Sequence, residues 1–202
     1  MTRLCLYCGS NAGSSPVFAA KAAKFGTAAA NRGIGLVYGG GSVGLMGIAA
    51  DAAMAAGGEV IGVITEQLLG AEVAHTNLTS LEVVPSMHER KARMEALADG
   101  FVVLPGGFGT VDEMAEILTW NQLGIVAKPV VLLDIDGFWS PLFEWMEGAV
   151  AAGFLRPAHR MLAQRARTVD EAIALATGPA PLTPHKWLDR DHTPARGVPV
   201  VP

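Results

Sequence analysis

The chain has 202 residues, half of them apolar, and its 15 basic and 19 acidic residues leave a net charge of −4. This length predicts a single domain with one substantial core, and no run of Lys or Arg is long enough to bind nucleic acid or a membrane surface. The opening MTRLCLYCGS is too short in its apolar part for a signal peptide, and no segment has the roughly 18 uninterrupted apolar residues of a membrane span. We therefore expect a cytoplasmic protein.

Along the chain, short apolar runs alternate with longer stretches of helical periodicity, which is typical of an α/β fold. The expected strands are 3–8, 35–38, 59–63, 81–84, 100–104 and 130–133. The expected helices are 16–31, 46–56, 88–98, 111–123 and 141–152, with a last short one in RTVDEAIALA at 167–176. Because the strand runs are almost continuously apolar, they predict a Rossmann-like, doubly wound parallel sheet flanked by helices. Residues 1–177 should form this one nucleotide-binding domain, and the Pro-rich residues 178–202 a tail that is poorly ordered or lies on the surface.

Cys5 and Cys8 are the only cysteines, and their CxxC spacing also occurs in redox and zinc sites. Residues three apart in a strand point to opposite faces, however, and no second pair of cysteines completes a tetrahedral site. The spacing therefore favours two buried strand residues. The five histidines show no HxxxH or HExxH spacing, so no metal site is predicted.

Two glycine-rich loops follow expected strands, which is where ligands bind in a sheet of this kind. In the first, Gly39, Gly41 and Gly44 form a GxGxxG pattern followed by Glu59, as in dinucleotide-binding proteins. Glu59 begins its strand, whereas a ribose-binding carboxylate belongs at the carboxyl end, so this match is weak. Contact with a phosphate or nucleotide is favoured over a purely structural use of the glycines in tight turns and close packing.

The second loop, PGGFGT at 105–110, leads directly into the carboxylates Asp112, Glu113 and Glu116. Thr110 and Glu113 have the spacing of a capping box, which by itself is a common structural feature. A cap needs no glycines, whereas bare backbone N–H groups at a helix amino end bind phosphate well. The loop is therefore interpreted as an anion site.

A basic helix precedes this second loop. Arg90, Lys91 and Arg93 lie in SMHERKARM at 86–94, and in isolation they would be read as a solvated helix face. The helix follows the expected strand 81–84 and so begins near the proposed ligand edge, where a guanidinium could bind a phosphate or a ribose.

Two of these motifs together resemble a known family. PGGFGTVDE and the upstream SMHERKARM are similar to the PGGxGTxxE and MHxRK motifs of LONELY GUY (LOG) proteins, the cytokinin riboside 5'-monophosphate phosphoribohydrolases. The similarity extends through GGGSVGLMG, EVAHTNLTSLEVV, LADGFVVLPGG and TWNQLGIVAKPV and covers residues 2–175. The family often has Leu-Glu where this chain has Val111 and Asp112.

The resemblance implies a homodimer that hydrolyses the N-glycosidic bond of a nucleoside 5'-monophosphate without a cofactor, releasing free base and ribose 5-phosphate. It implies Arg90 and Glu113 as the catalytic pair. The positions that it implies for substrate binding are Glu72, Arg90, Lys91, Gly107, Phe108, Gly109, Thr110, Val111, Asp112, Glu113 and Thr119. Whether the base is plain adenine or carries an N6 substituent stays open.

The chemistry of such a substrate explains why carboxylates follow an anion-binding loop. The phosphate is anionic, but the anomeric carbon becomes cationic as the glycosidic bond stretches. We expect the loop N–H groups and the Thr110 hydroxyl to bind the phosphate, and Glu113 to stabilise the developing charge or to deprotonate the attacking water. Asp112 and Glu116 are weaker candidates for contact with the ribose.

Two other functions stay open. A non-catalytic nucleotide or molybdenum-cofactor-type carrier would use the same fold and loops but needs no carboxylate at the anomeric carbon. An amino-acid decarboxylase would need a Schiff-base lysine for pyridoxal phosphate, and of the five lysines only Lys91 lies near the proposed site. Met87, Met94 and Met114 are interpreted as core or dimer-contact residues rather than base-stacking ones.

Overall fold

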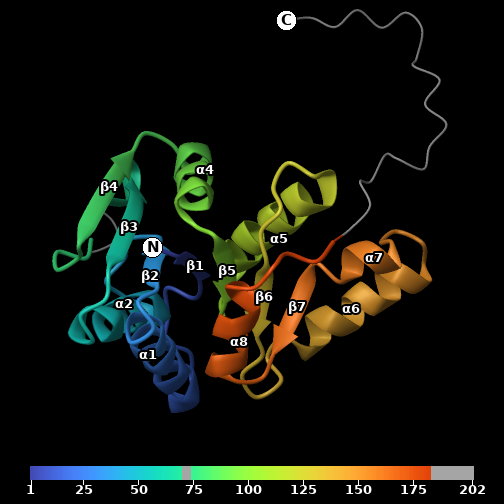
Figure 1. Cartoon of the computed structure of the whole chain (residues 1–202), viewed down its shortest axis with the longest axis horizontal. Helices are drawn as coiled ribbons and strands as arrows, with labels where there is room; N and C mark the ends of the chain where they lie inside the picture. The colour runs from blue at the N-terminus through green and yellow to red at the C-terminus, as the bar shows by residue number, and fades with distance from the viewer. Residues whose placement is uncertain (70–73, 183–202) are drawn as a thin grey trace, which may run out of the picture.

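The computed structural model describes residues 1–69 and 74–182, and in this part of the chain seven parallel strands form one sheet in the order β4-β3-β2-β1-β5-β6-β7 (Figure 1). The strands are β1 (Arg3–Tyr7), β2 (Gly35–Tyr38), β3 (Val60–Thr65), β4 (Ser80–Val84), β5 (Gly100–Val103), β6 (Val130–Leu133) and β7 (Ala163–Ala166). The helices are α1 (Pro16–Ala30), α2 (Gly44–Ala55), α3 (Glu66–Leu69), α4 (Met87–Leu97), α5 (Phe108–Leu123), α6 (Ser140–Ala151), α7 (Pro157–Arg160) and α8 (Val169–Ala176). The predicted Rossmann-like α/β class is confirmed, although β7, α3 and α7 were not predicted.

The strand order reverses beside β1. The chain builds one side of the sheet from β1 to β4, returns through α4, and continues with β5 on the other side of β1. At such a switch point the connections on the two sides diverge and leave a crevice at the carboxyl ends of the strands. The segments that follow β1 and β5 meet there, since the Gly9 N–H donates to the Pro105 carbonyl at 3.0 Å.

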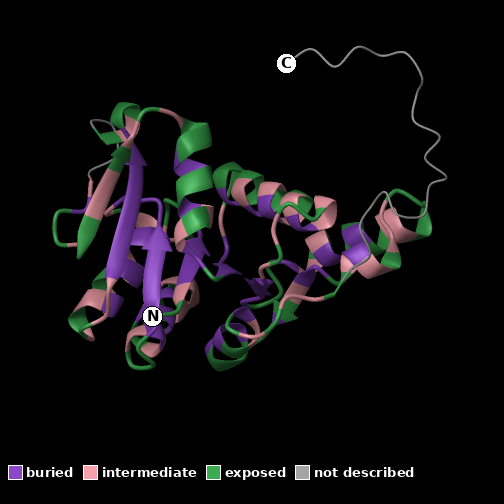
Figure 2. Cartoon of the chain, turned by 45° about the horizontal axis from the view of Figure 1, so that its top comes forward, coloured by how far each residue is buried: buried purple, intermediate pink, exposed green. Residues whose placement is uncertain are grey.

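The side chains of β1 alternate between two hydrophobic layers, one on each face of the sheet. Leu4 and Leu6 pack with α1, α2 and α8, whereas Cys5 and Tyr7 pack with α4, α5 and α6. Cys8 belongs to the first of these layers and Cys5 to the second, and both are free buried thiols, as their spacing predicted. Figure 2 shows the central strands buried and the exposed residues gathered on the outer faces of the helices.

One predicted feature of the second glycine loop is wrong. Helix α5 begins at Phe108 rather than at residue 111, and its N-cap is Gly107, which makes no side-chain capping bond. Thr110 therefore lies inside the first turn, where it is buried, and does not form the capping box predicted with Glu113. The Thr110 hydroxyl packs against Gly106 instead, since a Cβ on Gly106 would lie 2.1 Å from its oxygen. The first-turn N–H groups thus keep the unsatisfied character that binds anions.

Candidate active site

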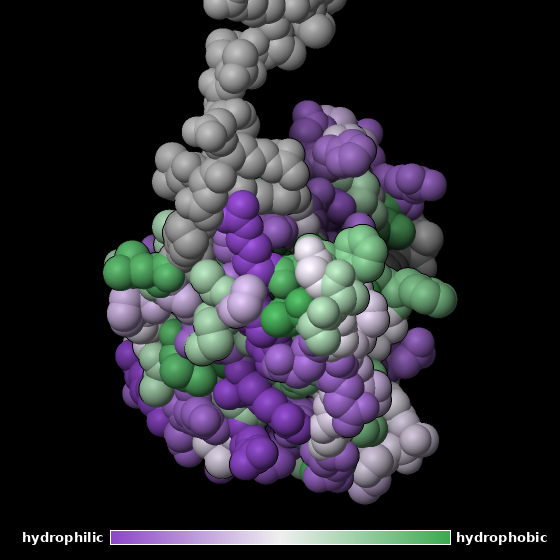
Figure 3. All heavy atoms as spheres, turned by 90° about the vertical axis from the view of Figure 1, so that its right-hand side faces the viewer, coloured by the Kyte–Doolittle hydropathy of each residue, from purple (hydrophilic) through white to green (hydrophobic). Residues whose placement is uncertain are grey.

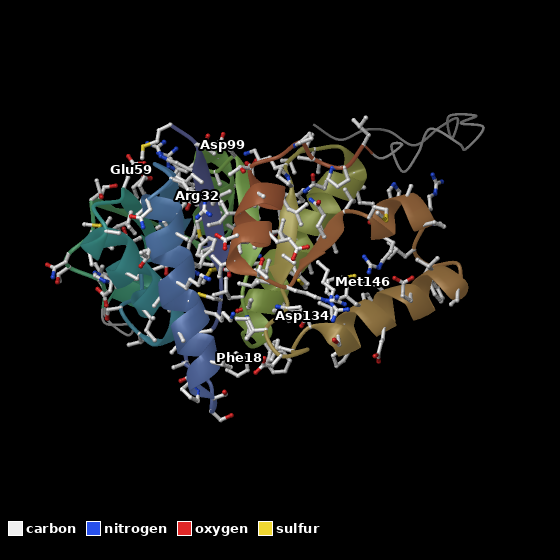
Figure 4. All side chains as sticks on the ribbon, turned by 60° about the horizontal axis from the view of Figure 1, so that its bottom comes forward. Phe18, Arg32, Glu59, Asp99, Asp134 and Met146 are labelled. Atoms are coloured by element: carbon white, nitrogen blue, oxygen red, sulfur yellow. The ribbon has the colours of Figure 1, made fainter. Side chains whose placement is uncertain are left out.

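A pocket of about 380 Å³ lies at the switch point of the sheet, within the size range of small-molecule sites. Two loops supply most of its wall, residues 8–13 after β1 and residues 105–109 after β5. The side chains that complete it come from helices and from one later loop: Phe18, Leu45, Met46, Arg90, Thr110, Glu113 and Phe138. In Figure 4, Phe18, which lines the pocket, and Glu59 lie on opposite sides of the molecule. The pocket and Glu59 are therefore at opposite ends of the strands.

Arg90 enters the pocket from the first turn of α4. The Ser86 side chain caps that helix by accepting from the Glu89 N–H at 3.2 Å. The buried guanidinium donates through Nε to the Val63 carbonyl at 2.9 Å and through Nη2 to the Gly39 carbonyl at 3.1 Å. Its third nitrogen, Nη1, lies 3.7 Å from the Glu113 carboxylate. The fork of the guanidinium is therefore fixed by one backbone carbonyl just after β2 and one within β3, and its Nη1 side faces the carboxylate.

The first glycine loop supports Arg90 instead of lining the pocket. A Cβ on Gly39 would lie 2.0 Å from Arg90 Nη2, and one on Gly44 would lie 2.2 Å from the Ser10 carbonyl carbon. Gly39, Gly41 and Gly44 are not among the residues found to line the pocket in the described part of the chain. The preference for nucleotide contact by these glycines is thus not supported, and close packing explains Gly39 and Gly44.

Glu59 has a structural partner, as its position at the start of a strand suggested. Its carboxylate accepts from Arg3 Nε at 2.7 Å at the amino edge of the sheet. This hydrogen bond lowers the pKa of the Glu59 carboxyl group. Glu59 therefore pairs with Arg3 outside the pocket described above, and a ribose-binding role for it there is not supported.

The second glycine loop leaves open space at the helix terminus. A Cβ on Gly107 or Gly109 would meet no atom within 4 Å, so neither glycine is explained by packing against the rest of the described chain. The amino end of α5 carries partial positive charge and points its N–H groups into this space. Glu113, whose side chain is 14% exposed, stands one turn further along the same helix. An anion and a cationic centre can thus be accommodated side by side.

The two thiols and the phenol near Glu113 are uncharged at ordinary pH. Burial raises the pKa of the Cys8 thiol well above its usual value, and the charge of Glu113 raises it further. Burial is also the largest cause of the raised pKa values of Cys5 and Tyr7 on β1. A thiol with a raised pKa is a poor nucleophile, so the pair of Arg90 and Glu113 carries the charge of the pocket.

Lys91 lies beside the pocket and bridges α4 to α5. Its Nζ is 3.1 Å from Asp112 Oδ2 and 3.2 Å from Glu116 Oε1. Burial lowers the pKa of this ammonium group, but the two carboxylates outweigh burial and the net pKa is raised. A lysine held in its charged form between two carboxylates does not fit the Schiff-base role that a pyridoxal phosphate enzyme requires.

The predicted site residues fall into four groups. The pocket contains Arg90, Gly107, Phe108, Gly109, Thr110 and Glu113. Lys91 and Asp112 pair with each other outside its lining, and Glu72 lies outside the described residues. Val111 and Thr119 line a different groove, and the Thr119 hydroxyl donates to the Ala115 carbonyl at 2.7 Å, so the structure does not bring Thr119 to this pocket.

That second groove, of about 530 Å³, lies between α5 and the α6–α7 region. Its lining is mostly apolar and includes the exposed side chains of Trp145 and Phe154. Figure 3 views the end of the molecule that carries α6 and α7 and shows hydrophobic side chains gathered there among polar ones.

The loop after β1 was missed by the sequence analysis. Ser10 and Asn11 line the pocket opposite the amino end of α5, and Phe18 and Phe138 form an edge-to-face aromatic pair with ring centroids 6.0 Å apart. The available signal was the position of GSN directly after the first strand, where a doubly wound sheet binds its ligands. Among the described residues, no three His, Cys, Asp or Glu side chains gather to hold a metal ion, and no helix there is long and apolar enough to cross a membrane.

The fold and the pocket together define a class of protein. It is a Rossmann-like α/β protein whose site suits an anionic ligand in which a positive charge develops. A family model described as possible lysine decarboxylase matches residues 46–176. The probable cytokinin riboside 5'-monophosphate phosphoribohydrolase LOGL1 of Oryza sativa is 44% identical over 171 residues, covering 85% of this chain and 77% of that protein. The phosphoribohydrolase LOG7 of Arabidopsis thaliana is 42% identical, with 85% and 79% covered. The chain therefore belongs to the LOG family of cytokinin riboside 5'-monophosphate phosphoribohydrolases, as its motifs indicated.

Solved structures share the fold. The molybdenum cofactor carrier protein of Chlamydomonas reinhardtii superposes with a TM-score of 0.66 at 25% identity, covering 86% of this chain and 94% of that one. The molybdenum cofactor binding protein of Rippkaea orientalis gives 0.62 at 24% identity, with the same coverage. The similarity to the Rippkaea orientalis protein shows a shared fold alone.

Proposed function

We propose that the protein hydrolyses the N-glycosidic bond of a cytokinin riboside 5'-monophosphate, or of AMP, to the free base and ribose 5-phosphate. The observation that carries this proposal is the placement of Glu113, 3.7 Å from the fixed guanidinium of Arg90 and one turn from the open amino end of α5. The 40–48% identity to phosphoribohydrolases over most of the chain supports the same activity.

In the proposed reaction the phosphate occupies the amino end of α5, where the loop N–H groups and Thr110 bind it. The bond between the base nitrogen and the anomeric carbon breaks, and the base leaves with the electron pair. Glu113 stabilises the positive charge that develops at that carbon, and it accepts a proton from the attacking water. The water oxygen becomes the new hydroxyl of ribose 5-phosphate, and the proton passes to the departing base.

Arg90 has two effects in this proposal. Its positive charge favours the ionised form of Glu113, which both roles of the carboxylate require. Its two bonds to backbone carbonyls prevent the guanidinium from collapsing fully onto the carboxylate, so the edge that faces the pocket can orient ribose hydroxyls.

The test follows base and ribose 5-phosphate by chromatography after incubation with AMP and, separately, with N6-isopentenyl-AMP. We expect release from the monophosphates, none from the matching ribosides that lack the phosphate, and a loss of at least about 10²-fold in kcat for Glu113→Gln. The ratio of the two rates assigns the preferred base. Base release that persists in Glu113→Gln contradicts the proposal.

A second candidate is a non-catalytic carrier, which is favoured by the 0.66 TM-score with a molybdenum cofactor carrier. A carrier has no use for a carboxylate next to the anomeric carbon. Binding of AMP by the wild-type protein without any base release would favour the carrier.

The proposal includes a homodimer in the cytoplasm. The apolar groove with exposed Trp145 and Phe154 supports association of two copies, because large exposed apolar patches mark interaction sites. Light scattering coupled to size exclusion measures the mass directly, and Trp145→Asp should lower it to that of one chain. A wild-type mass of 21.0 kDa would contradict the dimer.

A further inference from the structure

Three carboxylates lie within five residues at the start of α5, at Asp112, Glu113 and Glu116. Residues three or four apart on a helix are neighbours, with Cβ atoms about 5–6 Å apart, so Glu116 stands next to Glu113 and to Asp112. Like charges at such distances oppose each other's ionisation. If Glu113 acts in its ionised form, a nearby positive charge must offset this repulsion.

Arg90 and Lys91 are consecutive residues of α4, and they divide the three carboxylates between them. Arg90 faces Glu113, whereas Lys91 binds Asp112 at 3.1 Å and Glu116 at 3.2 Å. The Lys91 side chain is only 9% exposed, so its charge is weakly screened by water, although Asp112 is 63% exposed. Lys91 is not among the residues found to line the pocket, and its ammonium group is already bound by protein oxygens.

We infer that Lys91 is a positioning residue that neutralises Asp112 and Glu116, and thereby keeps the neighbouring Glu113 in its ionised form. This inference rests on the proposed function of Glu113. It assigns Lys91 a role different from the substrate contact that the family resemblance implied.

The other groups packed around Glu113 cannot replace Lys91. From β1 and the loop after it come Cys5, Tyr7 and Cys8, whose pKa values are all raised, chiefly by burial, so that they remain uncharged. From α4 comes Arg90, whose guanidinium is already shared with two backbone carbonyls. From α5 itself come the carboxylates of Asp112 and Glu116, the two groups that Lys91 binds.

The test measures kcat/KM for AMP against pH in Lys91→Met, which removes the charge and keeps the apolar stem. Activity falls at acid pH as the essential carboxylate is protonated, and unshielded Asp112 and Glu116 make that protonation easier. The acid limb should therefore move to higher pH by about half a unit to one unit. A Lys91→Met/Asp112→Asn/Glu116→Gln variant should move it back toward the wild-type position.

Two further variants complete the design. Asp112→Asn/Glu116→Gln with Lys91 intact should move the limb to lower pH, because the lysine charge then acts on Glu113 alone. Arg93→Met removes the same charge from α4, but Arg93 pairs with Glu82 at 2.6 Å, away from Glu113, so the limb should stay in place. A raised KM with an unmoved limb in Lys91→Met would overturn the inference in favour of substrate contact.

A second readout does not require any activity. The side-chain carboxyl of Glu113 is titrated by NMR in ¹³C-glutamate-labelled protein, with Glu113→Gln to assign the signal. We expect the Glu113 midpoint to rise in Lys91→Met and to return in the triple variant. An unchanged midpoint overturns the inference whether or not AMP is hydrolysed, whereas a shifted midpoint without hydrolysis leaves it standing and removes only the proposed function. If Lys91→Met does not fold, the Asp112→Asn/Glu116→Gln protein decides the question by the direction of its shift.

Discussion

At the scale of single residues, Arg90 depends on the planar fork of its side chain. Its nitrogens reach the Val63 and Gly39 carbonyls and one carboxylate, a set that the single nitrogen of a lysine cannot satisfy. We therefore expect Arg90→Lys to lower kcat/KM for AMP by at least about 10²-fold and the free energy of unfolding by about 1–3 kcal/mol. Steady-state kinetics and urea unfolding check the two effects. Arg93→Lys, in the half-exposed pair with Glu82, should change neither appreciably.

A substitution at Gly39 tests whether the position of the same guanidinium matters for activity. Its absent side chain makes room for Arg90, since a Cβ would lie 2.0 Å from Nη2. Gly39→Ala should displace the guanidinium from Glu113 and reduce kcat by about tenfold or more, because misplacement by about 1 Å is costly in catalysis. Gly148→Ala, on α6 with no atom within 4 Å of its Cβ, is the matched control. Equal activity of the two variants would show that Gly39 has no influence on the pair.

The residues of the site differed in how far the sequence could predict them. Arg90 and Glu113 stand in recognisable motifs, and the structure brings them together in one pocket. The contact of Arg90 with Gly39 could not be predicted, because 51 residues separate them and the glycine matched a nucleotide-binding pattern equally well. Likewise, the pairing of Lys91 with Asp112 and Glu116 depends on how α4 packs beside α5.

At the scale of elements, α5 begins in the glycine loop and ends at Leu123, and its C-cap Gly124 adopts a left-handed conformation with φ of 71°. Gly124→Ala should lower the free energy of unfolding by about 1 kcal/mol, because only glycine, and to a lesser degree asparagine, tolerates this conformation. Gly124→Asn should lose less. Urea unfolding measures both, and an alanine variant as stable as the wild type would contradict the explanation. Activity should be retained, since the pocket is at the other end of the helix.

The elements themselves followed from hydrophobic pattern, and the exceptions have physical causes. The strand β7 escaped prediction because its sequence, AQRA, is short and half polar, as an edge position allows. The start of α5 was misplaced because Thr110 and Glu113 match a capping box, while the chain instead enters the helix through Gly107. Thr110 instead packs its hydroxyl against Gly106 from inside the first turn.

At the scale of the whole molecule, two ion pairs make the sheet sensitive to acid. Hydrogen bonds from Arg3 and Arg93 are the largest causes of the lowered pKa values of Glu59 and Glu82. A carboxyl group with a lowered folded-state pKa stabilises the protein above its unfolded pKa, about 4.3, and that stabilisation is lost as the pH falls through the folded value. Glu59→Gln should therefore cost up to about 1 kcal/mol at pH 7 and progressively less as the pH falls below about 4.3, as measured by urea unfolding. A cost independent of pH would point to packing instead.

The crossover through α4 has a consequence for how the molecule could be divided. Arg90 belongs to the chain segment that completes the β1–β4 side of the sheet, whereas Glu113 follows β5 on the other side. A chain cut between α4 and β5 would leave the cation on one fragment and the carboxylate on the other, with only the pairing of β1 and β5 to rejoin the sheet. Neither fragment would carry both charged groups, so base release would become a reporter of fragment complementation.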